Sequence, residues 1–363
     1  MRVKLEDVCE RGSSNIKQSD IIKMSGNYPI YGASGLAGKV NFYHQEQPYV
    51  AVVKDGAGIG RTTLNPAKSS VIGTMQYLIP KKNVLPEYLF YVVSYMHLEK
   101  YYTGATIPHI YFKDYKNEEF NLDNIEKQLE IIDVLGRCKK VIEARKQELV
   151  ELDSLTKARF VEMFGDYINE GGKPLSELAT ITGGLTKNSK RNTFNLKMPY
   201  LRVANVFFNR LDLNEILEIG VREDEIGKTL LEAGDLLFVE GNGSIEQIGR
   251  VAIWDGSINQ ILHQNHLIKA RFHKKTILPE YALFYFMSQE GRQQIISKSV
   301  STSGLNTLSV NKISSLILPM PPIELQERFA AFVTQVNKSK VAVQKALDET
   351  QILFDSLMQK YFG

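Results

Sequence analysis

The sequence predicts an α+β protein in which two mixed α/β domains are joined by two long antiparallel helices and related by a pseudo-two-fold internal repeat. Three observations support this fold class. Several short segments recur in the same order in the two halves of the chain. Two stretches of roughly 40 residues are almost free of proline and glycine, which is typical of long helices. The remaining segments contain short β-rich runs separated by Gly, Asn and Pro, which is typical of strands and turns.

The internal repeat organises the chain. The matched segments are residues 85–88 with 278–281, residues 125–128 with 323–326, residues 164–165 with 362–363, and glycine-rich turns at 55–61 and 240–250. The order is the same in both halves, and the spacing drifts slightly because the second half carries insertions. We therefore expect domain 1 over residues 1–117, a connecting helix over 118–165, domain 2 over 166–322, and a second connecting helix over 323–363.

Each expected domain combines strands with one helix. The strand candidates are residues 49–54, 71–80, 235–239, 250–254 and 263–272. Helices are expected over 86–101 and 279–297, because proline suits the first helical turn and the following glutamate complements the helix dipole.

The two long helices carry apolar residues at alternating spacings of three and four, which predicts a seam along which they pack together as a coiled-coil pair. We expect the seam to contain Leu135, Ile142, Leu149, Leu152, Val333, Val336, Val343 and Leu347.

Composition narrows the class of protein. The chain has 363 residues, of which 43% are hydrophobic and 23% charged, and its net charge is +3. The charge permits nucleic-acid binding without requiring it. The sequence offers no membrane span or signal peptide, and its two cysteines, Cys9 and Cys138, are too few for a disulfide framework or a structural metal site. We expect a soluble, cytoplasmic protein.

No catalytic motif is recognisable. The chain lacks a G-x-x-x-x-G-K-[ST] loop, an H-E-x-x-H helix and the Asn/Asp-Pro-Pro-aromatic signature of adenine methyltransferases. The glycines at 56, 58 and 60 lie between expected strands, so a tight turn is favoured over a phosphate-binding loop. A weak match to a metal-dependent nuclease centre involves Glu87, Asp114 and Lys116, but the repeat replaces the last two with Lys312 and Ser314. We predict no catalytic, cofactor-binding or metal-binding residue.

Basic and amide side chains in loops and at strand ends are the best candidates for a functional surface. Lys and Arg can neutralise phosphates, and Arg, Asn and Gln can bond to base edges. The candidate DNA-binding residues are Lys39, Lys54 and Arg61 in domain 1, and Lys187, Lys190, Arg191, Arg202, Asn205, Asn242 and Arg250 in domain 2. The alternative for each of them is an ordinary solvated surface residue.

These features together resemble the specificity subunits of type I restriction-modification systems. The segments that carry the resemblance are residues 28–35 (YPIYGASG), 103–110 (TGATIPHI), 201–206 (LRVANV), 318–323 (LPMPPI) and the aromatic-glycine pairs at 164–165 and 362–363. The sequence departs from the family where it has Lys127 and Leu325 in place of a glutamate before a glutamine.

The resemblance implies a non-catalytic subunit with two target-recognition domains, each of which reads one half of a bipartite site in double-stranded DNA. It also implies that the helices dock two modification (methyltransferase) subunits and, through them, restriction subunits. S-adenosylmethionine, ATP and Mg²⁺ are expected only on those partner subunits. Two other interpretations stay open from the residues alone: a self-contained DNA methyltransferase or nuclease, and a scaffold that does not bind DNA.

Overall fold

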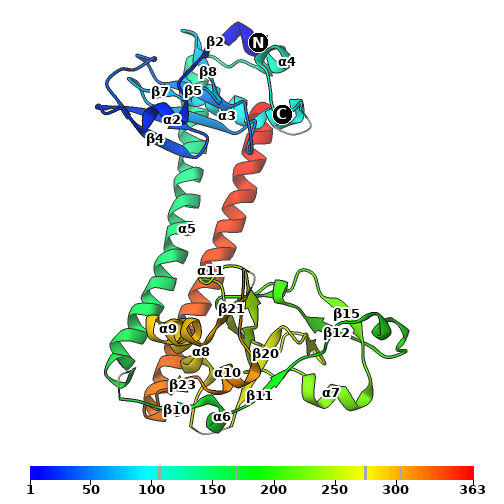
Figure 1. The fold of residues 1–363 in the computed structure, drawn as a ribbon. Helices are drawn as coiled ribbons and strands as arrows, with labels where there is room; N and C mark the ends of the chain where they lie inside the picture. The colour runs from blue at the N-terminus through cyan, green and yellow to red at the C-terminus, as the bar shows by residue number, and fades with distance from the viewer. Residues whose placement is uncertain (105–107, 169, 274–275, 303) are drawn as a thin grey trace. The chain divides into compact units, whose positions relative to one another are not determined.

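The computed structural model describes residues 1–104, 108–168, 170–273, 276–302 and 304–363. Contacts divide the chain into two compact units. The first unit contains Met1–Gln147 and Val343–Gly363, and the second contains Glu148–Ala342. The long helices α5 (Ile125–Ile168) and α11 (Ile323–Phe362) each contribute to both units (Figure 1). The expected fold class, mixed α/β domains with two long helices, is confirmed.

The first unit contains two sheets and a terminal strand pair. The larger sheet has the order β2 (Cys9–Ser13), β8 (Met75–Pro80), β5 (Tyr49–Val53), β6 (Thr62–Asn65), and the smaller has the order β4 (Gly35–Val40), β3 (Tyr28–Gly32), β7 (Ser70–Val71). Strand β1 (Arg2–Lys4) pairs with β9 (Glu119–Asn121). The short helices are α1 (Leu5–Val8), α2 (Gln18–Ile21) and α4 (Phe112–Tyr115). Helix α3 (Pro86–Tyr95) packs on the larger sheet (Figure 1).

The second unit repeats this plan. Its larger sheet has the order β11 (Ala179–Gly183), β20 (Leu267–Phe272), β16 (Leu236–Val239), β18 (Val251–Ile253), and its smaller sheet the order β15 (Leu217–Gly220), β12 (Lys197–Leu201), β19 (Leu262–His263). The terminal pair is β10 (Lys173–Pro174) with β23 (Ile317–Leu318). The corresponding helices are α6 (Leu175–Leu178), α8 (Pro279–Met287) and α10 (Val310–Ser314). In both smaller sheets the middle strand has one parallel and one antiparallel neighbour.

The second unit also carries elements beyond the shared plan. They are the hairpin β13 (Val206–Phe207) and β14 (Arg210–Leu211), the sheet β17 (Gly241–Asn242), β22 (Leu305–Thr307), β21 (Val300–Thr302), the helices α7 (Glu223–Thr229) and α9 (Gln289–Lys298), and the 3₁₀ helices η2 (Ser189–Thr193) and η3 (Val203–Asn205). These additions account for the drift in spacing between the repeated segments.

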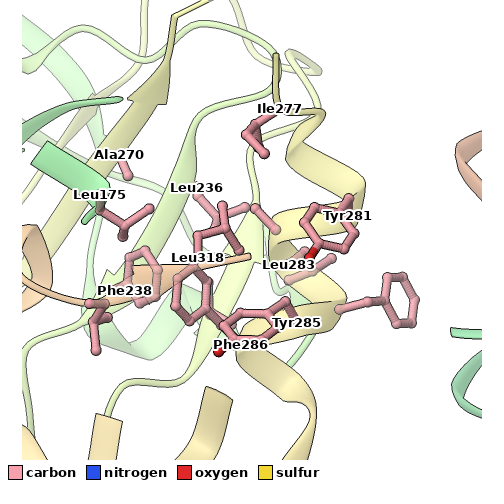
Figure 2. Packing of buried hydrophobic residues seen from close by; sticks show 14 of the residues in the cluster. Leu175, Leu236, Phe238, Ala270, Ile277, Tyr281, Leu283, Tyr285, Phe286 and Leu318 are labelled. Atoms are coloured by element: carbon pink, nitrogen blue, oxygen red, sulfur yellow. The ribbon is translucent and has the colours of Figure 1, made fainter. Parts of the chain in front are cut away.

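Strands β5 and β16, the central strands of the larger sheets, are each buried on both faces. In β5, Val50 and Val52 belong to the core under α3, whereas Ala51 and Val53 face the core under the smaller sheet. Successive side chains of a strand point to opposite faces, so a continuous apolar run is needed here. Strand β16 follows the same rule, and Figure 2 shows Leu236 and Phe238 packed with Tyr281, Tyr285 and Phe286 of α8.

Several expected elements are divided in the structure. The strand candidates 71–80 and 263–272 each become two strands in different sheets, β7 with β8 and β19 with β20. The expected helix 86–101 ends at Tyr95 and is followed by the 3₁₀ helix η1 (Leu98–Tyr101), because His97 adopts a left-handed conformation with φ 50°. The expected helix 279–297 divides at Ser288, whose hydroxyl caps α9 by accepting from the Gly291 N–H.

The bounds of the first long helix also differ from the expected segment 118–165. Residues 119–121 form β9, which pairs with β1, so helix α5 begins at Ile125 and continues to Ile168. Helix α11 begins at the expected residue, Ile323.

The same corner anchors a long helix in each unit. The buried Gln128 accepts from the Leu85 N–H (2.9 Å) and donates to the carbonyls of Asn83 (3.0 Å) and Asp123 (2.9 Å). The side-chain amide therefore ties the start of α5 to the loop that precedes α3.

Gln326 makes the matching contacts in the second unit. It accepts from the Leu278 N–H (2.8 Å) and donates to the carbonyls of Thr276 (3.0 Å) and Pro321 (2.9 Å). The corner therefore forms in both units although Lys127 and Leu325 depart from the family pattern.

The seam residues are largely buried. Leu135, Ile142, Val343 and Leu347 are buried in the first unit, Val333 and Val336 are buried in the second, and Leu149 and Leu152 are half-buried in the second. The helices run antiparallel within the second unit, because Phe160 packs on Phe329 (5.4 Å between ring centroids) while Asp153, earlier in α5, pairs with Lys340, later in α11.

Candidate nucleic-acid interface

In the first unit, the central strand β5 ends in a glycine turn, defined here as residues 54–60. The Gly60 N–H donates to the Val53 carbonyl (2.9 Å), and the Val53 N–H donates to the Arg61 carbonyl (2.9 Å). Gly60 has a φ of 79°, and a Cβ at this position would lie 2.5 Å from the Glu99 nitrogen, so both conformation and space require glycine. The turn therefore fixes Arg61 at the start of β6.

The second unit builds the same turn from residues 240–249. The Gly249 N–H donates to the Val239 carbonyl (3.2 Å), and the Val239 N–H donates to the Arg250 carbonyl (2.9 Å). Gly249 has a φ of 60°, and a Cβ there would lie 2.5 Å from a methyl carbon of Ile295. Arg250 is thus the structural equivalent of Arg61, although the second turn is longer.

Each of these arginines holds a second loop. The loop that follows the middle strand of the smaller sheet, called here the strand-end loop, comprises residues 33–34 in the first unit and 203–205 in the second. Arg61 donates from Nη1 to the Ala33 carbonyl (3.0 Å), and Arg250 donates from Nη2 to the Val203 carbonyl (3.3 Å). Ala33 and Val203 each lie two residues beyond a residue paired in parallel with β7 or β19, namely Tyr31 and Leu201.

A third segment joins at the same end of the central strand. The Ile110 N–H donates to the Lys54 carbonyl (2.9 Å), and the Leu308 N–H donates to the Glu240 carbonyl (2.7 Å). We call the three joined segments of each unit the loop platform. Residues 105–107 of the motif 103–110 lie outside the described residues.

The first platform carries exposed cations and one histidine–carboxylate pair. The side chain of Lys54 is half-buried and that of Arg61 is exposed, and within the described part of the chain neither takes part in an ion pair. His109 Nδ1 lies 2.6 Å from the Asp55 carboxylate, and its ring stacks on that of Tyr111. Neither cation is neutralised by a carboxylate of the described residues, although the Arg61 guanidinium is engaged with the Ala33 carbonyl.

The second platform packs its guanidinium groups on aromatic rings. The hairpin β13–β14 presents Phe207 to two arginines, Arg210 at 4.2 Å and Arg250 at 5.1 Å from the ring centroid. The Arg250 Nε is buried without a hydrogen-bond partner, and burial lowers the pKa of its guanidinium, which stays charged at neutral pH. Asn209 at the hairpin tip adopts a left-handed conformation with φ 49°.

Arg292 of α9 braces the longer glycine turn from behind. Its Nη1 donates to the Ile248 carbonyl (2.7 Å), its Nη2 donates to the Glu246 carbonyl (3.1 Å), and its guanidinium lies 4.9 Å from the Phe208 ring. Burial lowers the pKa of this guanidinium too. Helix α9 thus contributes side-chain hydrogen bonds to the longer turn.

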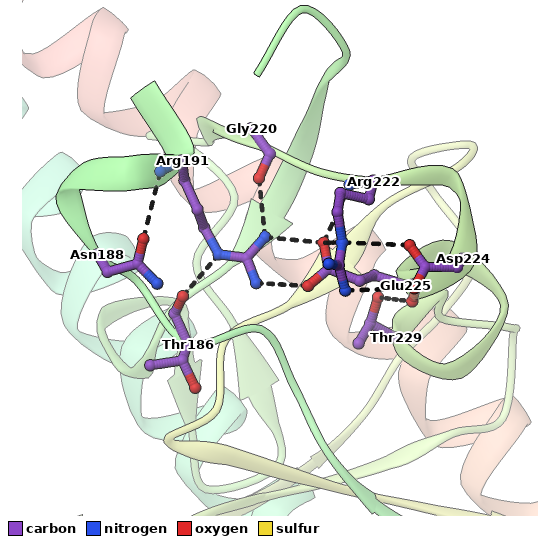
Figure 3. Close-up of polar contacts among 8 residues, drawn as sticks. All are labelled: Thr186, Asn188, Arg191, Gly220, Arg222, Asp224, Glu225 and Thr229. Atoms are coloured by element: carbon purple, nitrogen blue, oxygen red, sulfur yellow. Dashed lines mark hydrogen bonds and ion pairs between the residues drawn. The ribbon is translucent and has the colours of Figure 1, made fainter. Parts of the chain in front are cut away.

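Arg191, a predicted DNA-binding residue, has a structural role instead (Figure 3). It is buried, forms a two-point ion pair with Glu225 (2.8 and 3.1 Å), and donates to the carbonyls of Thr186 (2.6 Å) and Gly220 (2.9 Å). The Arg191 hydrogen bonds hold the pKa of the Glu225 carboxyl below its usual value. These contacts direct the guanidinium into the domain, while the neighbours Lys187 and Lys190 are exposed on the loop that it anchors.

Asn205 is also engaged inside the domain, which corrects its assignment to the DNA surface. It is buried, accepts from the Arg202 N–H (2.8 Å), and donates to the carbonyls of Asp212 (2.8 Å) and Glu215 (3.1 Å). The Arg202 side chain pairs with the Glu215 carboxylate at 2.7 Å. These two residues fix the strand-end loop from within.

The remaining candidates differ in location. Asn242 lies on β17 in the glycine turn, and its carboxamide oxygen accepts from the Ser244 N–H (2.9 Å). Lys39 is exposed on β4 opposite Pro29 and is not part of the first platform. The structure therefore places Lys54 and Arg61 at one glycine turn and Asn242 and Arg250 at the other, with Arg202 directly before the strand-end loop of the second unit. It leaves Lys39, Lys187 and Lys190 on other loops or strands.

Sequence reasoning missed the aromatic partners of the second platform. Phe207, Phe208, Arg210 and Arg292 were not candidates, and His109 was noted only within a family motif. The sequence signal was Phe-Phe-Asn-Arg at 207–210, an aromatic pair followed by an arginine in a segment that the first half of the chain lacks.

No group of three or more His, Cys, Asp or Glu side chains is placed to hold a metal ion among the described residues. None of the helices in this part of the chain has the length and apolar character needed to cross a bilayer.

The fold is that of a duplicated α/β module assembled on two long helices, with a basic loop platform in each copy. The sequence model of the type I restriction modification DNA specificity domain matches residues 1–153 and 172–350. This match covers most of the chain, which therefore belongs to that family.

The curated relatives that the chain matches are named as type I specificity subunits. The chain is 31% identical over 196 residues to the type I restriction enzyme EcoKI specificity subunit of Escherichia coli (strain K12), and 28% identical over 188 residues to the putative MjaX specificity subunit of Methanocaldococcus jannaschii. The alignments cover 52% and 51% of this chain and 41% and 43% of those proteins, so they span less than half the length of these relatives.

Solved structures share the fold over the whole chain. The type I restriction-modification system S subunit from M. genitalium superposes with a TM-score of 0.61 at 14% identity, covering 100% of this chain and 96% of that one. A chain from a study of complex assembly and conformational transition of the type I R-M system gives a TM-score of 0.58 at 14% identity, covering 99% and 97%. At this identity the likeness concerns the fold alone.

Proposed function

We propose that this chain is the DNA-recognition subunit of a type I restriction-modification complex and that each unit reads one half of a bipartite target in double-stranded DNA. The observation that carries the proposal is the duplication of the loop platform. Two equivalent sets of loops, each joined at the end of a buried central strand and each presenting basic side chains, suit two related half-sites better than one continuous site.

The side chains on the platforms match the chemistry of duplex DNA. Lysine and arginine neutralise phosphates, while arginine and amide groups hydrogen-bond to base edges in the major groove. Lys54 and Arg61 in the first unit, and Arg210 and Arg250 in the second, supply positive charge in loops that rigid sheets support. A rigid scaffold with variable loops is a common arrangement for specific binding.

The chain itself carries no chemistry in this proposal. S-adenosylmethionine, ATP and Mg²⁺ would be bound by partner subunits, and the long helices would dock two methyltransferase subunits and, through them, restriction subunits. Family membership supports this division of labour, as does the naming of the EcoKI and MjaX relatives as specificity subunits. We place the complex in the cytoplasm, where chromosomal DNA is accessible.

The direct test is methylome sequencing of cells that express this chain with its methyltransferase partner. We expect one motif made of two specified halves separated by unspecified bases. No methylated motif, or one continuous motif, would contradict the proposal.

A second experiment addresses the alternatives from other classes. Purified chain alone is incubated with DNA and either labelled S-adenosylmethionine or Mg²⁺, and we expect neither methyl transfer nor cleavage. Turnover by the chain alone would favour a self-contained enzyme. A scaffold that does not touch DNA would show no salt-dependent, sequence-selective binding even with the methyltransferase subunit present.

Exchange of domains separates the two half-sites. Replacing residues 1–117 with the matching segment of a related protein should change one half of the methylated motif and leave the other intact. Loss of both halves in a folded, assembled product would show that the two units do not read DNA independently.

A further inference from the structure

We propose that Arg61 and Arg250 are positioning residues that hold the loops of each platform together, so that each arginine sets the specificity of its own half-site without reading a base. This inference rests on the proposed function and concerns how the same site achieves selectivity.

One arginine contact recurs in both units. In each unit an arginine follows the glycine turn and donates from an Nη atom to the carbonyl of a strand-end loop, Arg61 to Ala33 and Arg250 to Val203. The two loops differ in sequence, and the two turns differ in length. Because the contact is present in both units despite these differences, it depends on the main chain of the loop and not on the loop side chains.

The arginine contact joins loops that belong to different sheets. The glycine turn of the first unit joins β5 to β6 in the larger sheet, whereas Ala33 follows β3 in the smaller sheet. No strand pairing joins these two sheets among the described residues. Within the described part of the chain, main-chain hydrogen bonds connect the two loops only through the segment 72–74, where the Lys54 N–H donates to the Thr74 carbonyl and the Ile72 N–H donates to the Tyr31 carbonyl. The Arg61 side chain is therefore their direct link. Selective binding needs such preorganisation, because loops that must be ordered on binding weaken it.

Both arginines start from a fixed main chain, and the Arg250 side chain is packed as well. The main-chain atoms of Arg61 and Arg250 are fixed by the paired hydrogen bonds that close each turn. Arg250 is further packed on Phe207, with its Nε buried. Arg61 has no such ring contact among the described residues and is exposed. The first platform therefore relies on the hydrogen bond from Arg61 to the Ala33 carbonyl without the aromatic packing that supports Arg250.

The experiment uses the full chain co-expressed with its methyltransferase subunit. The variants are Arg61→Ala, Arg250→Ala and the matching lysine substitutions. The control is Arg210→Ala, because Arg210 packs on the same Phe207 ring but its guanidinium donates to no main-chain carbonyl among the described residues. The readouts are the methylated motif, the binding constant of duplex DNA as a function of salt, and the melting temperature.

We expect each alanine variant to relax several base positions of its own half of the motif by roughly tenfold in discrimination, and to leave the other half unchanged. Relaxation confined to a single base position would indicate direct base readout and would overturn the inference. The slope of log K against log salt should stay within half a unit of that of the wild type. Each lysine variant should recover part of the selectivity, since an ammonium group can donate to the same carbonyl. Arg210→Ala should lower the salt slope by about 0.9 and leave the motif unchanged.

The inference would be overturned if Arg61→Ala kept its motif while the salt slope fell by about one unit, which is the behaviour of a phosphate contact. Relaxation of both halves in a folded protein would also overturn it. If Arg250→Ala does not fold, the exposed Arg61 decides the outcome. If the wild-type chain yields no bipartite motif, the proposed function fails, and that result is distinct from an unchanged motif in the variants.

Discussion

The two loop platforms share one main-chain frame and differ in the side chains that occupy it. The first presents Lys54 and Arg61 with few packing partners, whereas the second surrounds Arg250 with an aromatic ring and an added hairpin. The paired hydrogen bonds that close the glycine turns are the same in both. Backbone hydrogen bonds therefore fix where the loops begin and end, while the loop side chains are free to differ.

The difference extends below the surface. His263 on β19 occupies the position that Val71 has on β7, since each pairs with an equivalent residue of the neighbouring strand. The second unit is thus built on the same plan with more buried polar groups, among them Arg191 and His263. We expect the two units to respond differently to acid and to the loss of single polar side chains.

The largest expected effect concerns the helix seam. Leu347→Asp should lower the free energy of unfolding by about 5 kcal/mol, because it deletes a buried apolar side chain and places an unpaired carboxylate there. Leu149→Asp, at a half-buried position, should cost about 2 kcal/mol. Thermal and urea unfolding measure both. If Leu347→Asp were neutral, the seam would be misplaced.

The corner glutamines test the equivalence of the units. Gln128→Leu and Gln326→Leu should each destabilise by about 4 kcal/mol, because each change leaves three main-chain partners without a hydrogen bond at a buried site. The control is an exposed glutamine of α11, Gln335→Leu. Costs that differ between the corners by more than about 2 kcal/mol would break the comparison.

The Arg191 network is expected to stabilise the second unit alone. Arg191→Ala should cost about 3 kcal/mol, since Glu225 would lose both points of its ion pair in a poorly hydrated site. Lys190→Ala, at the exposed neighbouring position, should leave stability within about 0.5 kcal/mol and weaken DNA binding only slightly. Equal stabilities of the two variants would show that the buried pair contributes nothing.

The acid response of His263 is the smallest of the expected effects. Burial lowers its pKa to about 4 from an ordinary value of 6.5. The unfolded chain therefore binds the proton more tightly, so stability is full above pH 6.5 and falls as the pH is lowered toward 4. At pH 5 the loss should be about 2 kcal/mol.

The matched variant is His263→Val, which reproduces the residue of the first unit. It should remove this part of the pH dependence between pH 4 and 6.5. Unfolding curves at a series of pH values provide the measurement, and an unchanged slope in the variant would assign the acid sensitivity to other groups.

Sequence pattern predicted the fold class and the repeat because both depend on local, periodic signals. Apolar spacing along the helices and the recurrence of Leu-Pro-Glu-Tyr before a glutamine-bearing helix start are visible without any contact information. Even so, the boundary near residue 118 was misplaced, since a strand of three residues, β9, acquires its identity only by pairing with β1.

The candidate site was predicted in part. Arg61 and Arg250 were predicted as basic residues in loops or at strand ends, but their hydrogen bond to a main-chain carbonyl has no sequence signature. Arg191 and Asn205 were selected by residue type, and they turn out to face the interior of the domain. The type of a residue determines which groups its side chain can bond. It does not determine which of those groups lies within reach in the folded protein.

The sequence by itself determined the duplicated architecture, the two long helices and the positions of the glycine turns, because hydrophobic periodicity and backbone conformational limits act over a few neighbouring residues. Only the tertiary structure decided which cations remain available to a ligand. Arg191 is buried because it pairs with a carboxylate 34 residues away along the chain, whereas Arg61 has no such partner among the described residues and stays exposed. Such pairings arise when sheets and loops close, and no local pattern encodes them.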